Sequence, residues 1–204
     1  MDRIAEVTRV TKETDIYIKI NLDGSGKSKI KTGIGFFDHM LEGFAKHGLF
    51  DLEVKVKGDL NVDCHHTIED TGIVLGEVIR RALGDKSGIK RYGNFLLPMD
   101  ETLVMCGVDL SGRPYYVSDL KFTNDRTGEM DNCMVDEFFY AISYSAMMNL
   151  HFVQMRGVND HHIIEATFKA FAWQQLLTKG LMECFLQKVL FNSINFTNFL
   201  NNFV

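Results

Sequence analysis

Residues 63–70 read D-C-H-H-T-I-E-D, and residues 159–166 read N-D-H-H-I-I-E-A. The two stretches share the core pattern H-H-x-I-E. Upstream of each stretch, a run of alternating apolar residues begins at an E-T pair, at residues 13 and 101, and the two runs align without a gap. Residues 38–52 can likewise be aligned with residues 136–150. Such self-similarity is typical of an internal duplication, so we predict two structurally similar halves.

Each half is predicted to contain two strands, a helix, another strand and another helix. Apolar and polar residues alternate over 16–20 and 52–56, which is the period of half-buried strands. Residues 36–47 and 68–83 carry apolar residues at helical spacing, and Gly84 follows the second run as a helix stop. We therefore expect an α+β fold with an internal duplication, in which each of two similar half-domains packs a β-sheet against helices.

The composition is that of an ordinary globular protein. The chain has 204 residues, of which 46% are hydrophobic and 24% charged, and its net charge of -5 argues against a nucleic-acid partner. We find no apolar stretch long enough to span a membrane. Residues 1–14 are charged and do not resemble a secretory signal, so we expect a cytoplasmic protein with reduced cysteines. The four cysteines form no C-x-x-C pair, which leaves no thiolate metal motif.

The repeated H-H-x-x-E pattern has the spacing of a metal site. On a helix the two histidines and the glutamate emerge near one face, while adjacent histidines point about 100° apart and can bind different ions. One copy alone is equally typical of a polar helix N-terminus. The two copies and His39 together hold five of the seven histidines, which favours metal binding. Imidazole and carboxylate ligands without a thiolate suit Mn best, with Zn or Fe less favoured.

Two further residues are candidate ligands. Glu137 takes in the second half the position that His39 has in the first half, so internal symmetry alone makes it a candidate. His151 lies on an alternating strand next to Leu150 and Phe152. A packed histidine, or an outer partner of a ligand, is more typical of that position than a ligand.

The chain resembles the imidazoleglycerol-phosphate dehydratase family of histidine biosynthesis from Arg3 to Ala172. Five motifs carry the resemblance in order: T-G-I-G-F-F-D-H-M-L (32–41), H-H-T-I-E-D (65–70), P-M-D-E (98–101), D-L-S-G-R-P (109–114) and H-H-I-I-E-A (161–166). The resemblance implies a hydro-lyase that converts D-erythro-imidazole-glycerol phosphate to imidazole acetol phosphate. It also implies two Mn ions per active site and a homo-oligomer, a shell of 24 subunits whose sites form where subunits meet.

The resemblance also assigns roles to individual residues. The metal ligands of the family fall on His39, His65, His66, Glu69, His161, His162 and Glu165. Glu137 takes the remaining ligand position, where some members have a histidine. The substrate-binding positions fall on Glu13, His39, His47, Arg91, Arg113 and Lys169, of which the last four residues contact the phosphate. Glu13 matches the general acid/base of the family.

The implied reaction explains the need for such residues. Water leaves the glycerol carbon beside the imidazole ring, and a proton leaves the next carbon, which no carbonyl group acidifies. Metal ions on the ring nitrogens favour its deprotonated form and make the ring an electron relay, while a carboxylate such as Glu13 can move protons. The residues alone would equally suit a dinuclear metallohydrolase acting on a phosphorylated small molecule, or a metal-binding shell protein without turnover. The resemblance favours the dehydratase.

The resemblance ends after Ala172. Family members continue with a segment of the type S-S/T-K-G, whose serine and lysine bind phosphate, and residues 173–204 lack it. A back-translation can be chosen whose neighbouring reading frame has a family-like ending. Our hypothesis is that this atypical C-terminal tail is a frameshift product that could leave the dehydratase inactive; a genuine lineage-specific tail is the alternative. The two half-repeats are expected at 1–88 and 89–172.

Overall fold

The two halves of the chain have the same sheet topology. The computed structural model describes residues 3–172, and its first half forms β1 (Ile4–Val10), β2 (Thr14–Asn21), β3 (Ser28–Lys31), α1 (Gly35–Gly48), β4 (Asp51–Gly58) and α2 (His65–Leu83). The second half forms β5 (Tyr92–Met99), β6 (Thr102–Asp109), β7 (Tyr115–Ser118), β8 (Arg126–Thr127), β9 (Met130–Asp131), α3 (Met134–Ala146) and β10 (Asn149–Arg156), followed by a helix over residues 160–172. The two four-stranded sheets have the orders β1-β2-β4-β3 and β5-β6-β10-β7, each with one parallel pair at the last position. The predicted duplication and the α+β class are confirmed.

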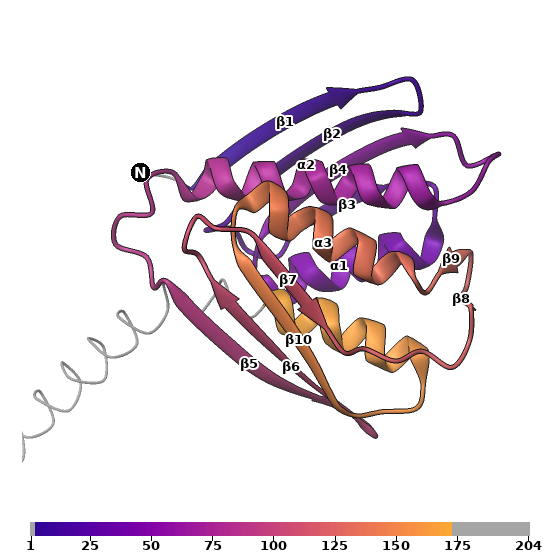
Figure 1. Cartoon of the computed structure of the whole chain (residues 1–204). Helices are drawn as coiled ribbons and strands as arrows, with labels where there is room; N and C mark the ends of the chain where they lie inside the picture. The colour runs from indigo at the N-terminus through magenta and orange to yellow at the C-terminus, as the bar shows by residue number, and fades with distance from the viewer. Residues whose placement is uncertain (1–2, 173–204) are drawn as a thin grey trace, which may run out of the picture.

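The helices lie between the two sheets (Figure 1). Ile16, Ile18 and Ile20 of β2 are fully buried toward the helices, and the residues between them face outward. Leu150 and Phe152 of β10 are buried in the same way in the second sheet. Strict alternation in the sequence therefore places one apolar face of each sheet against a shared helical layer.

The helices of the described chain all begin at the same end of the molecule, on the right in Figure 1. α2 and α3 run side by side, and two glycines allow their close approach. A Cβ atom on Gly72 would lie 2.7 Å from the carbonyl oxygen of Phe138, and one on Gly76 would lie 2.8 Å from that of Ile142. Because α1, α2 and the helix 160–172 carry their candidate ligands near their starts, this arrangement gathers those ligands at one end.

Each half has one strand more than the sequence predicted, and the second half also contains an unpredicted hairpin. β3 and β7 are short edge strands that pair in parallel with β4 and β10, and β8–β9 is a two-stranded hairpin before α3. Segments this short carry little periodicity, so their sequences gave no clear strand signal. α2 begins at His65, ahead of the predicted start at residue 68, and it ends as predicted at Gly84, whose φ is +56°.

The two halves share one hydrophobic core. Phe37 of α1 lies edge-on to Phe138 of α3, with 5.1 Å between the ring centroids, and Phe44 stacks on Phe171 at 5.6 Å. Residues 84–91 connect the halves, and the limits 1–88 and 89–172 stay predictions. The proposed frameshift tail, residues 173–204, lies outside the described residues. No helix within residues 3–172 is both long and apolar enough to cross a membrane.

Candidate metal centre

The starts of the two repeated helices are built alike. The backbone N–H of His65 donates to Oδ1 of Asp63 at 2.8 Å, and the backbone N–H of His161 donates to Oδ1 of Asn159 at 3.0 Å. These bonds satisfy an N–H group that the first turn of a helix leaves without a backbone partner. The residue two places before each histidine pair therefore fixes where the helix begins and which way its first turn faces.

The first histidine of each pair approaches the glutamate four residues later. Nε2 of His65 lies 3.4 Å from Oε2 of Glu69, and Nε2 of His161 lies 3.1 Å from Oε2 of Glu165. This is the contact expected between positions i and i+4 on one helix face. In each repeat, one imidazole nitrogen and one carboxylate oxygen therefore lie next to each other.

A third ligand joins this pair in the second half. One ligand atom each from His39, His161 and Glu165 lie within 4.8 Å of one another, and within residues 3–172 this is the one group of three that does so. His39 reaches the pair from α1, and its ring lies 6.1 Å from that of His161. The structure therefore brings together three of the predicted metal ligands from two helices. His65, His66 and Glu69 lie at the start of α2 and are not part of this group.

The second histidine of each pair is held by a carboxylate on its Nδ1 atom. Nδ1 of His66 lies 3.0 Å from Oδ2 of Asp59, and Nδ1 of His162 lies 2.8 Å from Oε2 of Glu101. These hydrogen bonds raise the pKa of both histidines, and the His162 contact lowers the pKa of Glu101 to about 2. A carboxylate on one ring nitrogen is the usual way to orient an imidazole whose other nitrogen binds a metal.

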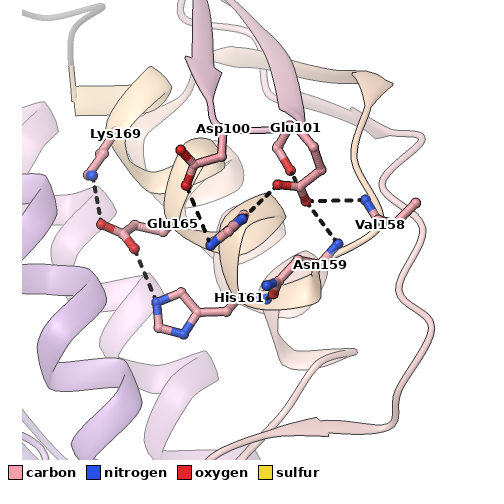
Figure 2. Close-up of polar contacts among 9 residues, drawn as sticks. Asp100, Glu101, Val158, Asn159, His161, Glu165 and Lys169 are labelled. Carbon is pink, nitrogen blue, oxygen red and sulfur yellow. Dashed lines mark hydrogen bonds and ion pairs between the residues drawn. The ribbon is translucent and has the colours of Figure 1, made fainter.

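Glu101 has a further structural role that Figure 2 shows. Its Oε1 accepts hydrogen bonds from the backbone N–H groups of Val158 and Asn159, at 3.5 and 3.1 Å, at the entrance to the helix 160–172. Sequence reasoning did not single out Asp59 or Glu101 as partners of the histidines. A signal for Glu101 existed, because the duplication aligns Glu101 with Glu13.

The candidate phosphate-binding cations fall into two pairs. Nζ of Lys169 lies 2.6 Å from Oε1 of Glu165, beside the ligand group, and burial together with the charge of Lys169 lowers the pKa of His47. Arg91 donates through Nε to Oδ1 of Asp109 at 2.6 Å, and the charge of Arg113 also acts on that carboxylate. His47 and Lys169 are therefore close to the candidate metal ligand Glu165 of their own chain, whereas Arg91 and Arg113 both lie beside Asp109.

Three other candidates lie outside the ligand group. Glu13 is exposed just before β2, and its negative charge contributes to the raised pKa of His66, which places the two side chains near each other. Glu137 is exposed on α3 and takes no part in the group of three ligands. His151 is exposed on the outer face of the second sheet, where its ring stacks against Tyr115 with 6.3 Å between the centroids.

Two repeated sheet-and-helix units with histidines and carboxylates at the helix starts define a class of duplicated α+β proteins with a candidate His/Glu metal site. Residues 32–174 match the family described as imidazoleglycerol-phosphate dehydratase. The chain belongs to the imidazoleglycerol-phosphate dehydratase family.

Individual relatives agree with this membership. The chain is 64% identical to the imidazoleglycerol-phosphate dehydratase of Lachnoclostridium phytofermentans and 59% identical to that of Acetivibrio thermocellus, in each case over 84% of this chain and 88% of the relative. The crystal structure of the Staphylococcus aureus dehydratase is similar, with a TM-score of 0.77 and 38% identity over 86% of this chain and 97% of that one. The structure of the Pyrococcus furiosus protein in complex with (S)-C348 has a TM-score of 0.74 and 35% identity, over 84% and 92% of the two chains.

Proposed function

We propose that this chain dehydrates imidazoleglycerol phosphate in histidine biosynthesis at a dinuclear manganese centre built from its repeated His/Glu helices. The observation that carries the proposal is the convergence of His39, His161 and Glu165 within 4.8 Å in a chain that belongs to the dehydratase family. Family membership does not favour the metallohydrolase or the shell protein without turnover.

The donor set fits a hard divalent ion. His39, His161 and Glu165 would hold one ion, and His65 and Glu69, whose side chains meet in the same i and i+4 geometry, would contribute to a second. Imidazole and carboxylate ligands with no thiolate suit manganese. When bound, such an ion acts as a Lewis acid that polarises the imidazole ring of the substrate.

The remaining residues of the site would position the substrate and move protons. The carboxylate of Glu13 is exposed beside His66, where it can take the proton from the substrate carbon next to the one that loses water. The ammonium group of Lys169, with His47 beside it, can bind the dianionic phosphate. The helices begin at the candidate metal ligands, so their positive dipole ends lie there and favour an anionic substrate.

A single chain supplies the ligands in separate groups, which supports a site completed by other subunits. His65 and Glu69 lie outside the group formed by His39, His161 and Glu165. We propose a homo-oligomer of 24 subunits in which neighbouring chains complete each two-ion site. A cytoplasmic location, expected from the charged residues 1–14, stays a prediction.

The outer face of the second sheet supports this assembly. It carries exposed or half-buried apolar side chains on four adjacent strands: Tyr92, Leu96, Met105, Val153, Tyr115 and Val117. The outer face of the first sheet instead carries many charged residues, including Lys19, Lys29, Lys31, Lys55 and Lys57. A contiguous apolar face on a water-exposed sheet marks a protein contact, and a second copy of this chain is the proposed occupant. Leu96→Lys should shift the protein to smaller species in sedimentation velocity, while Lys19→Ala should not.

A pair of matched variants tests the catalytic proposal. Glu165 and Glu77 each form an i and i+4 ion pair, with Lys169 and Arg81 respectively, but Glu165 alone belongs to the ligand group. Glu165→Gln should bind no manganese and should no longer produce imidazole acetol phosphate, whereas Glu77→Gln should keep both properties. Turnover of imidazoleglycerol phosphate by protein stripped with a chelator and verified metal-free would refute the metal proposal. No turnover by the manganese-loaded unaltered chain would refute the dehydratase activity of this chain.

A further inference from the structure

One segment of the second half contacts the starts of several helices. Residues 123–132, here called the clamp segment, contain β8 and β9 and precede α3. The first half has no counterpart, because β3 ends at Lys31 and α1 begins at Gly35. Figure 1 shows β8 and β9 at the end of the molecule where the helices begin. The segment is therefore an addition to the duplicated plan, at the end that carries the candidate ligands.

The clamp segment forms several hydrogen bonds with Asp160, the residue directly before His161. Asp160 is 4% exposed, and its carboxylate accepts hydrogen bonds from the backbone N–H groups of Thr123 and Asn124, at 2.9 and 2.7 Å. The side-chain amides of Asn124 and Asn132 donate to Oδ2 of the same carboxylate at 2.9 and 3.2 Å. A carboxylate this buried is stable as an anion only with such a set of donors.

The clamp segment also contacts α2 and α1. Sγ of Cys64, which precedes His65 and aligns with Asp160 in the repeat, donates to Oδ2 of Asp131 at 3.6 Å. A Cβ atom on Gly128 would lie 3.2 Å from Cβ of Phe36 on α1, and the ring of Phe36 lies 5.1 Å from that of His161. One segment thus contacts the starts of the three helices that carry His39, His65 and His161.

We infer that Asp160 is a positioning residue for the metal centre and that the clamp segment, through this buried carboxylate, holds His161 in register with His39. This inference rests on the proposed metal site. The reasoning is geometric, since His161 and His39 come from separate helices and their approach depends on where the helix 160–172 begins. Asp160 fixes that start through five donor groups of the clamp segment, the fifth being the hydroxyl of Thr123, while neither imidazole bonds to the segment directly.

The test is a manganese titration of the full chain, read by the EPR signal of free Mn²⁺, which reports binding without any need for activity. Asp160→Asn should weaken manganese binding by roughly 10-fold, the lower end of the effect of removing a direct outer partner of a metal ligand, because Asp160 acts on His161 only through the start of the helix. The cause is that the new amide group would face backbone and side-chain N–H groups that need an acceptor. Asp125→Asn makes the same charge change at an exposed position of the same segment and should bind manganese as the unaltered chain does.

A milder variant protects the test against failure to fold. Asn124→Ala removes one exposed donor to Asp160 and should weaken manganese binding by a smaller factor, with the thermal midpoint of the metal-free protein nearly unchanged. The inference would be overturned if folded Asp160→Asn and Asn124→Ala bind manganese as tightly as Asp125→Asn does. If the unaltered chain itself binds no manganese, the proposed metal function fails instead, so the two failures are distinguishable.

Discussion

The close contact of α2 with α3 predicts opposite effects for one substitution at two glycines. At Gly43 of α1, no atom beyond its chain neighbours and its own helix backbone lies within 4 Å of the position that a Cβ would take. A Cβ on Gly76 would lie 2.8 Å from the carbonyl oxygen of Ile142 and 2.8 Å from Cβ of Ser145. Alanine is favoured over glycine in a helix interior by about 1 kcal/mol, so Gly43→Ala should raise the free energy of unfolding by up to that amount. At Gly76 the same gain is opposed by overpacking, which typically costs about 1–3 kcal/mol.

At Gly76 the overpacking should exceed the gain, because the nearest atoms include a backbone carbonyl that cannot turn aside as a flexible side chain can. We expect Gly76→Ala to lower the free energy of unfolding by up to about 2 kcal/mol, or up to roughly 8 °C in the thermal midpoint for a chain of this size. The assay is urea and thermal unfolding at one fixed protein concentration, since assembly makes the midpoint depend on concentration. A stabilisation by Gly76→Ala equal to that of Gly43→Ala would refute the tight packing described for these helices.

Three further predictions concern the site. The double variant His65→Ala with His161→Ala should abolish tight manganese binding, because each repeat donates ligands, and full metal content by elemental analysis would contradict this. Glu13→Gln should lose turnover while its metal content stays normal; near-normal activity would show that another group moves the proton. In metal-free protein the pKa of His162 should lie above its ordinary value of 6.5, and NMR titration of Glu101→Gln should show it lowered. The stabilisation from this contact is present below pH 6.5 and is lost as the pH rises through the raised pKa.

The sequence was sufficient for those parts of the fold that have a strong period. The alternation over residues 16–20 and 52–56 and the helical spacing over 36–47 predicted β2, β4 and α1, because each has one face in the core. β3 and β7 have only four residues each and lie beyond the central strands, so neither has enough buried positions to produce a recognisable pattern.

The candidate site, like the fold, could be predicted from the sequence only in part. The pairing of His161 with Glu165 could be anticipated from the repeat, because the spacing on a helix fixes which side chains share a face, whereas the approach of His39 from α1 could not. The contacts made by Asp160 and Glu101 could not, since they join segments far apart in the sequence through bonds that depend on the tertiary fold. The positions of Glu13 and Glu137 relative to the ligands also depend on neighbouring elements, and spacing carries no information about these.

The shared core has a consequence for the origin of this chain. The face of α2 that bears Gly72 and Gly76 is covered by α3, and Phe37 of the first half rests on Phe138 of the second. A half-length ancestor folded on its own would expose this helical face to water, a large apolar surface that isolated proteins of that size do not tolerate. Such an ancestor would therefore have existed as a pair of identical chains with paired helices. Fusion of the two genes then allowed each copy to change separately. Glu101 could form a hydrogen bond with His162, while its counterpart Glu13 stayed exposed to solvent.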